Sequence, residues 1–342
     1  AGAEPGPACY GLGNERPTVT DANVVLGVLN QNSLAGGSLP IDAKCSMNAI
    51  DRHIADPLGL SRLEAAAGVR QIINVAMARA IRSVTVERGR DPRDMTLFAF
   101  GGSGPAHAVD VAVLLGITKV IVPVMSGVFS AVGMLGADIE HNLVQNLFRE
   151  LDQLETVEVM DVIQHLRHEG ARRLYNDGFD QSDFDMRFSA DMHYLGQSSE
   201  LTVGFDPSEI ERKGPESLSA AFHAAYLETY GYQNNEPVEL VNIRLSALGV
   251  RQHRIAFAEG NAGVGAREAT GAMREVWFES SRQLMSAMIY PRSVVDTGAV
   301  TGPAILEAYD TTIVVPPRCV AHNDACGSVV IDIAPELTGD AA

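Results

Sequence analysis

The feature that most constrains the fold is a strand, a glycine loop, a helix and a second strand in immediate succession. Residues 96–100 form a short apolar run bounded by turn residues, which is typical of a buried strand. A loop, Gly101-Gly-Ser-Gly-Pro105, leads into a helical pattern over 106–115 that ends at Gly116, and residues 119–124 form a second apolar run. Such a succession predicts a βαβ unit, so we expect the first 150 residues to be mainly α/β.

The glycine loop is the best candidate for a binding site. Glycines after a strand let the backbone approach a ligand closely, and the N-terminus of the following helix favours an anion or a polar sugar. The same glycines are equally compatible with a tight turn that binds nothing. His107 stands where a dinucleotide fingerprint requires Gly or Ala, and the absence of a Gly-Lys-Ser/Thr motif excludes a P-loop.

Two side chains are candidates for catalysis. His107 falls in the first turn of the predicted helix, where the helix dipole disfavours a protonated imidazole. It is therefore either a neutral group near a ligand or a half-buried, hydrogen-bonded histidine. Asp21 directly precedes an apolar helical run, so it is either a helix N-cap or a carboxylate that lines the cleft opposite the loop. Cys9 is a second candidate to line that cleft, but a nucleophilic role would need a lowered thiol pKa and a nearby base.

The chain is 342 residues long, more than twice the length of a domain of about 150 residues, so we expect more than one domain. A capping box at Ser61 and Glu64 begins a long helix that continues toward Gly89. The pattern of apolar and polar residues changes near residue 151. Beyond it, helical patterns over 157–175 and 208–230 alternate with strand-like runs.

One of these runs, 241–247, alternates apolar and polar residues, which predicts a strand with one wet face. Residues 259–272 are rich in glycine and alanine and are typical of a linker. Short strands separated by proline and glycine follow, which favours a small β-rich domain. We therefore divide the chain into 1–150, 151–258 and 259–342.

The net charge disfavours two classes of partner. The chain has 26 Lys and Arg against 43 Asp and Glu, a net charge of −17. Binding to a phosphate backbone needs clustered cations, and an anionic membrane surface would repel this chain, so we expect neither nucleic acid nor membrane as a partner. There is also no run of about 18 apolar residues that could span a bilayer.

The cysteines and histidines predict no metal site. The four cysteines are scattered and show neither C-x-x-C spacing nor a zinc-finger histidine. His165 and His168 do not make an H-E-x-x-H motif and are most simply part of a solvated helix face. Sparse cysteines in a chain of this length, without a signal-like N-terminus, favour reduced thiols and a cytoplasmic location.

Seven segments, in order along nearly the whole chain, resemble landmarks of the A-type (alpha) subunits of the hydantoinase/oxoprolinase family, which includes subunits related to acetone and acetophenone carboxylases. The segments are Ala3-Glu-Pro-Gly-Pro-Ala-Cys-Tyr-Gly11, Pro17-Thr-Val-Thr-Asp-Ala-Asn23, Ile54-Ala-Asp-Pro-Leu-Gly59, Arg88-Gly-Arg-Asp-Pro-Arg93, Phe98-Ala-Phe-Gly-Gly-Ser-Gly-Pro105, Tyr194-Leu-Gly-Gln-Ser198 and Asp310-Thr-Thr-Ile-Val-Val-Pro-Pro317.

The resemblance implies part of an actin-like ATPase fold, of the sugar kinase, Hsp70 and actin kind, followed by the β-rich segment. In such folds Gly101, Gly102, Ser103, Gly104 and Pro105 would contact the adenosine of ATP. The phosphate loops of the D-x-G-G-T type would precede them, and this sequence contains none. We therefore expect a missing N-terminal half of the A-type subunit, an expectation that the start on Ala1 also favours, with Mg²⁺ neutralising the phosphates.

The resemblance further implies an ATP-dependent cyclic-amide hydrolase, in which phosphorylation of a carbonyl oxygen precedes ring opening. A B-type subunit would carry the second step, so we expect a hetero-oligomer and a small-molecule substrate. Two alternatives remain open. The chain could belong to an ATP-dependent ketone carboxylase, or it could be a non-catalytic structural half of a split subunit.

Overall fold

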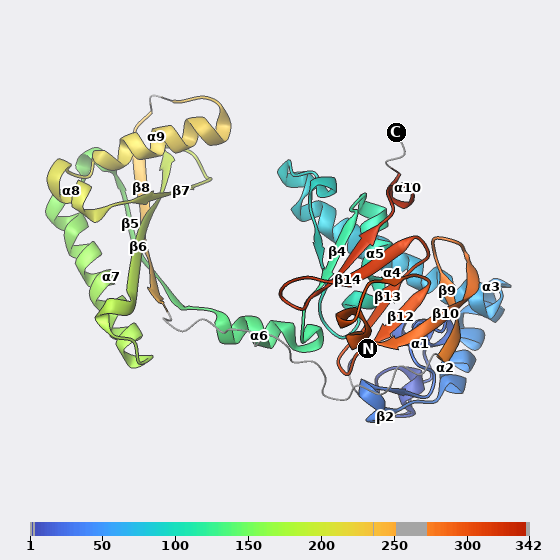
Figure 1. Cartoon of the computed structure of the whole chain (residues 1–342). Coiled ribbons are helices and arrows are strands. Elements are labelled where there is room, and N and C mark those ends of the chain that lie inside the picture. The colour runs from blue at the N-terminus through green and yellow to red at the C-terminus, as the bar shows by residue number, and fades with distance from the viewer. Residues whose placement is uncertain (1, 3, 235, 251–271, 340–342) are drawn as a thin grey trace. The chain divides into compact units, whose positions relative to one another are not determined.

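The computed structural model describes residues 2, 4–234, 236–250 and 272–339 (Figure 1). Its residues pack as two units: the first joins Ala1–Met134 to Ala256–Ala342, and the second is Leu135–Ile255. Sequence analysis placed boundaries at 150 and 258; the structure instead changes unit near 134 and 255, and it returns the last segment to the first unit. Most of the predicted linker over 259–272 lies outside the described residues.

The predicted βαβ unit is confirmed in the first unit. Strands β3 (Leu97–Phe98) and β4 (Lys119–Val122) pair in parallel, and α5 (Gly104–Leu115) lies between them in sequence. The helix begins two residues before the predicted start because Pro105 fits its first turn, where a missing N–H costs nothing. It ends where predicted, because Gly116 adopts the left-handed conformation with φ of 74°.

The C-terminal segment forms one sheet by itself and contributes three strands to another, which it shares with the βαβ unit. One sheet has the order β11-β14-β15-β4-β3, in which β15 pairs antiparallel with β4 of the βαβ unit. The second sheet has the order β13-β12-β10-β9. The strands of this segment are β9 (Ala272–Phe278), β10 (Gln283–Pro291), β11 (Val300–Thr301), β12 (Ala304–Glu307), β13 (Thr312–Val315), β14 (Cys319–Asn323) and β15 (Val329–Ile333).

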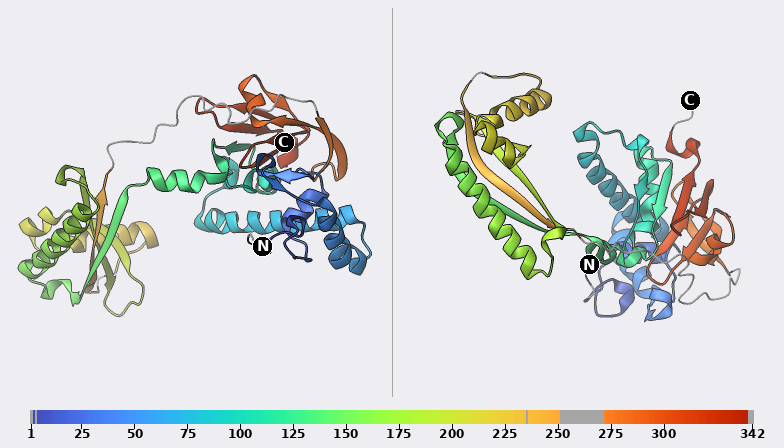
Figure 2. Two further views of the ribbon diagram at one scale, coloured as in Figure 1. Left: turned by 90° about the horizontal axis from the view of Figure 1, so that it is seen from below. Right: turned by 60° about the vertical axis from the view of Figure 1, so that its left-hand side comes forward.

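Strands β12 and β13 are buried on both faces, which is why each is a continuous apolar run in the sequence. Leu306 and Ile313 pack in a core shared with α5 and the other sheet. Their neighbours Ile305 and Val314 point the other way and pack against helices α1 (Val19–Val25), α2 (Ala43–Ile50) and α4 (Arg62–Val84) (Figures 1 and 2).

The capping box that begins α4 is confirmed: the Ser61 hydroxyl accepts from the Glu64 N–H, and the Glu64 carboxylate accepts from the Ser61 N–H. The helix ends at Val84, five residues short of the predicted Gly89, which instead closes a following 3₁₀ turn. The remaining short elements of this unit are β1 (Ser33–Leu34), β2 (Leu39–Pro40), α3 (Asp56–Leu58) and α10 (Pro335–Thr338).

In the second unit three helices cover one face of an antiparallel sheet of order β5-β8-β6-β7 (Figure 1). The strands are β5 (Ile139–Glu150), β6 (Phe184–Tyr194), β7 (Leu201–Phe205) and β8 (Val238–Gly249), and the helices are α7 (Thr156–Asn176), α8 (Pro207–Lys213) and α9 (Ser217–Tyr230). The boundary between the two units falls within α6 (Phe129–Gly136), none of whose residues is buried.

One sequence prediction needs correction here, and a second is confirmed. The single helix expected over 208–230 is two helices, because Gly214 adopts a positive φ and Pro215 cannot donate an N–H to a continuing helix. The alternation predicted over 241–247 is confirmed: Val241, Ile243, Leu245 and Ala247 are buried, and the residues between them are half-buried. Val241 has no partner in either neighbouring strand, and before this bulge Leu240 is buried as well.

Gly27, at the turn between α1 and the sheet, provides a test of the packing in the first unit. It has φ of 71°, and a Cβ there would lie 2.1 Å from the Glu275 carbonyl oxygen. Gly59 has a similar φ of 65° but open space around it. We expect Gly27→Ala to lower the free energy of unfolding by more than about 3 kcal/mol and Gly59→Ala by about 1 kcal/mol, measured by urea denaturation. Equal losses would mean that the close approach of Glu275 contributes nothing.

Candidate functional site

Two further loops of the first unit contact the predicted glycine loop. The Gly101 N–H donates to the Ser126 carbonyl oxygen of the loop after β4, at 2.7 Å. The turn between β12 and β13 joins both loops. Its Thr311 hydroxyl donates to the carbonyl oxygens of Gly101 and Gly102, each at 3.2 Å, and its Asp310 carboxylate accepts from the Gly127 N–H at 2.7 Å. The glycine loop therefore has fixed partners on both sides.

The glycines of these loops serve different purposes. A Cβ at Gly127 would lie 2.5 Å from the Asp310 carbonyl oxygen, so packing requires glycine there. Gly101 has φ of 86°, which favours glycine by conformation. A Cβ at Gly101 or Gly104 would meet no atom within 4 Å, and one at Gly102 would make only an ordinary contact. The loop thus leaves open space over the N-terminus of α5, where a ligand could approach the backbone.

Three aromatic rings lie beside the loop. Phe98 and Phe100 are each 45% exposed, and both rings lie 5.5 Å from the ring of Phe129, measured between centroids. Rings at these distances contact one another, and the exposure leaves an apolar surface next to the backbone of the loop. Sequence analysis predicted a buried strand over 96–100, which is wrong for Phe98 and Phe100, and it did not consider Phe129.

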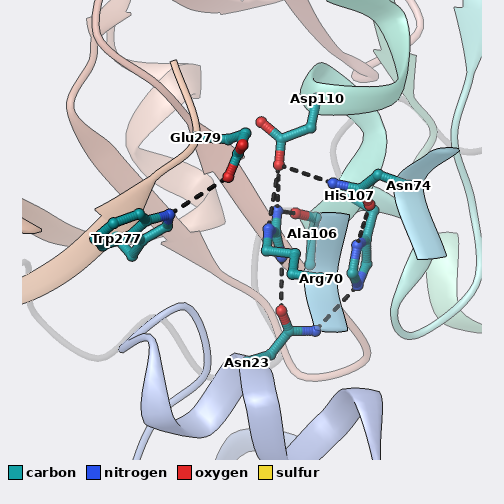
Figure 3. Close-up of polar contacts among 8 residues, drawn as sticks. All are labelled: Asn23, Arg70, Asn74, Ala106, His107, Asp110, Trp277 and Glu279. Atoms are coloured by element: carbon teal, nitrogen blue, oxygen red, sulfur yellow. Dashed lines mark hydrogen bonds and ion pairs between the residues drawn. The ribbon is translucent and has the colours of Figure 1, made fainter. Parts of the chain in front are cut away.

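A buried arginine lies beneath the start of α5 (Figure 3). The Arg70 side chain, from α4, is 3% exposed and forms an ion pair with Asp110 at 2.8 Å. It also donates to the side-chain amide oxygen of Asn23 at 2.6 Å and to the backbone carbonyl oxygen of Ala106. Because these acceptors belong to α1 and α5, one guanidinium ties three helices together.

His107 belongs to the same network, and its partners fix its tautomer. The Asn23 amide oxygen accepts from Arg70, so the Asn23 NH₂ group donates to His107 Nε2 at 3.0 Å. His107 Nδ1 then carries the hydrogen and donates to the Asn74 amide oxygen at 2.7 Å, while the Asn74 NH₂ group donates to Asp110 at 3.3 Å. Both ring nitrogens therefore have partners, and the hydrogen bonds form a closed ring.

The surroundings keep His107 neutral. Burial, and secondarily the Arg70 guanidinium, lower the pKa of His107 from 6.5 to about 3. A neutral imidazole with both nitrogens engaged agrees with the second of the two interpretations offered by the sequence, a buried, hydrogen-bonded histidine. The catalytic role assigned to His107 stays a prediction.

Asp21 is a centre of hydrogen bonds near the start of the chain. Its carboxylate accepts from the backbone N–H groups of Ala8, Cys9 and Thr18, at 2.8 to 3.0 Å, and from the hydroxyls of Thr18 and Ser46. Burial raises the pKa of Asp21, but these hydrogen bonds lower it below its ordinary value. Thr18 is the N-cap of α1, and Asp21 is its partner in a capping box rather than the cap itself.

The structure does not join the two predicted catalytic residues. Among the described residues, no hydrogen bond links Asp21 to His107; Asn23, two residues along α1, makes the contact instead. Burial raises the pKa of the Cys9 thiol to about 12, which is opposite to what a nucleophile needs. In the described part of the chain no three His, Cys, Asp or Glu side chains are placed to hold a metal ion.

Family models match both parts of the chain. The hydantoinase/oxoprolinase model matches residues 1–143, and the model of the hydantoinase/oxoprolinase C-terminal domain matches residues 149–326. The chain therefore belongs to the hydantoinase/oxoprolinase family. Within the described residues no helix has the length and apolar character needed to cross a membrane.

Known relatives of this mixed α/β chain include two enzyme subunits. The caprolactamase subunit alpha of Pseudomonas jessenii is 33% identical over 93% of this chain and 46% of its own length. The acetophenone carboxylase gamma subunit of Aromatoleum aromaticum is 33% identical over 97% of this chain and 47% of its own. The crystal structure of the ATP-dependent caprolactamase of P. jessenii superposes with a TM-score of 0.74 at 30% identity, over 97% of this chain and 49% of that one. The chain thus spans about half the length of these relatives.

The neutral His107 generates a prediction about stability and pH. Between the folded pKa of about 3 and the ordinary value of 6.5, the unfolded chain binds a proton that the folded protein does not. The free energy of unfolding should therefore fall as the pH is lowered below 6.5, by up to about 1.4 kcal/mol per pH unit from this group.

His107→Gln should remove that contribution, so its stability should depend less steeply on pH than that of the wild type. Urea denaturation between pH 6.5 and 5 measures both slopes, and His53→Gln, which replaces an exposed histidine, is the control. Parallel slopes for the wild type and His107→Gln would show that His107 is protonated in the folded protein.

Proposed function

We propose that this chain supplies the adenosine-binding side of an ATP-dependent enzyme that phosphorylates a carbonyl oxygen before a cyclic amide is opened. The observation that carries the proposal is the glycine loop itself, held by two neighbouring loops and open above the N-terminus of α5. Membership of the hydantoinase/oxoprolinase family and the likeness to an ATP-dependent caprolactamase support it.

In this proposal the loop residues 101–105 contact the adenosine, as they would in an actin-like ATPase fold. Backbone N–H groups and a helix N-terminus suit a polar sugar or a phosphate, and they need no basic side chain. That fits a chain with a net charge of −17. Mg²⁺ would be held together with the phosphates by a segment that carries the phosphate loops.

The substrate chemistry follows from the weakness of an amide as an electrophile. The carbonyl oxygen attacks the γ-phosphorus of ATP, the bond from that phosphorus to the bridging oxygen breaks, and ADP leaves. Water adds to the imidate carbon of the resulting phosphate ester, and the ring C–N bond breaks to release the amine and leave an acyl phosphate. A second water then attacks that acyl phosphate, releasing phosphate and leaving the carboxylate. In this scheme His107 and Asp21 act as positioning residues, because every acceptor or donor described on them is already engaged by the protein.

Two partners belong to the proposal. The phosphate-binding half would pack against the exposed surface made by Phe98, Phe100 and Phe129, which lies beside the loop. A B-type subunit would carry out the ring opening, so the working enzyme would be a hetero-oligomer. The names of the two relatives, both called subunits, support an assembly of this kind.

A ketone carboxylase is the second candidate, because the acetophenone carboxylase subunit is as similar to this chain as the caprolactamase subunit is. There the enol oxygen of a ketone would be phosphorylated and the enol carbon would capture carbon dioxide. ATP consumption that depends on bicarbonate and a ketone, with none on lactams or hydantoins, would decide for this candidate over the first.

The binding proposal can be tested on the 342-residue chain itself by calorimetric titration with adenosine and with ATP. Because the proposed contacts reach only the adenosine, the two ligands should bind with affinities within about threefold of each other. We expect Gly104→Val to weaken both at least tenfold, because its side chain would enter the open space above the loop. Gly68→Val, in the middle of α4 with similar open space, is the matched control.

Three results would contradict the proposal. Unchanged binding by Gly104→Val would remove the glycine loop as the site. ATP binding about a hundredfold tighter than adenosine would place the phosphate contacts in this chain. Failure of the wild-type chain to bind either ligand, alone or with its complementary half, would favour a purely structural role.

A further inference from the structure

The face of the second unit's sheet that points away from its three helices carries an unusual row of side chains. In the register of the strands, Glu150 of β5 lies opposite Glu239 of β8, which in turn lies opposite His193 of β6. Directly opposed residues of antiparallel strands share a face. The neighbours Met192 and Leu240 pack in the core under the helices, so Glu239 and His193 lie on the other face.

The two carboxylates of this row are poorly compensated. Like charges directly opposed across a sheet destabilise it. Arg149, next to Glu150 in sequence, does not offset them, because it pairs with Glu158 at 3.0 Å. The contact described for Glu239 is with His193 Nε2, at 2.7 Å. The row therefore holds more negative charge than its described neighbours neutralise.

His193 adds an unsatisfied acceptor. The residue is 7% exposed, and its Nδ1 is enclosed without a hydrogen-bond partner in the described part of the chain. Since a carboxylate only accepts, the hydrogen of the neutral ring lies on Nε2, facing Glu239. Nδ1 then presents a lone pair that lacks a donor, and buried polar atoms without partners are rare enough to call for an explanation.

Phe148 lies beside His193 and has a strained backbone and an exposed ring. It sits at the bulge of β5 between Asn146 and Arg149, with a left-handed φ of 48° that is costly for a bulky residue. Its side chain is 59% exposed, and the ring centroid lies 6.4 Å from that of His193 in an edge-on arrangement. An exposed aromatic face attracts cations.

We infer that Phe148, Glu150, His193 and Glu239 form a binding site for a cationic N–H donor, an ammonium or a guanidinium group. Such a group supplies what the three features lack: positive charge for the carboxylates, a donor for Nδ1 and a cation for the aromatic ring. A metal ion fits less well, because among the described residues no three ligating side chains are close enough to hold one. Because Nδ1 is enclosed and lies on the side of the imidazole away from Glu239, the ring must turn before a donor on the bound group can reach it.

The test is a titration of the full chain carrying ¹³C-labelled histidine, followed by NMR. Three probes are compared: methylammonium, a short peptide containing one lysine, and the same peptide with that lysine acetylated and neutral. We expect the His193 resonance to shift saturably with the charged probes, with millimolar affinity, and not with the acetylated peptide. His141, which is also paired to a carboxylate, Asp177 at 2.5 Å, serves as the internal control and should not saturate.

Two variants sharpen the result. Glu239→Gln should weaken binding about tenfold, and Phe148→Leu, an exposed change that leaves the fold intact, should weaken it about threefold. Tighter binding of the charged peptide than of methylammonium would identify a basic partner segment as the source, and equal binding would identify a free amine. No saturable shift of His193, or an equal shift with the acetylated peptide, would overturn the inference.

Discussion

The arrangement around the glycine loop depends on the burial of one guanidinium. An arginine stays charged at any pH that the protein meets, so its burial is tolerated only where acceptors surround it. Arg70 finds them on three helices, in Asn23, Ala106 and Asp110. Removing Asp110 would leave the buried charge without its ion-pair partner, which is far more costly than losing an ordinary hydrogen bond. Arg70 therefore fixes α5, the helix that follows the glycine loop, against α1 and α4.

The glycine loop itself is held by the turn between β12 and β13, in the C-terminal part of the chain. Thr311 donates to Gly101 and Gly102, and Asp310 accepts from Gly127, although about two hundred residues separate the partners. The sheet provides the reason, because β15 pairs with β4 and brings the C-terminal strands into the unit that contains the loop. The segment that sequence analysis separated as a β-rich domain is thus part of the candidate site.

Local chemistry made several features predictable from the sequence. The capping box of Ser61 and Glu64, the helix stop at Gly116 and the parallel strands around the glycine loop all follow from interactions between residues close in sequence. The errors arose where a neighbour in space or a single backbone detail decided the outcome. Gly214 and Pro215 divide a predicted helix, and Phe98 and Phe100, predicted to lie in a buried strand, are exposed.

The sequence by itself determined the family, the α/β character of the first part and the glycine loop as a candidate site, because these rest on contiguous motifs. Only the tertiary structure decided what surrounds that loop. It decided that Asp21 and His107 are engaged by their own protein, that Asp310 and Thr311 hold the loop, and that His193 has an unpaired nitrogen. Hydrogen bonds between residues far apart in sequence leave no local pattern, and burial is a property of the whole fold.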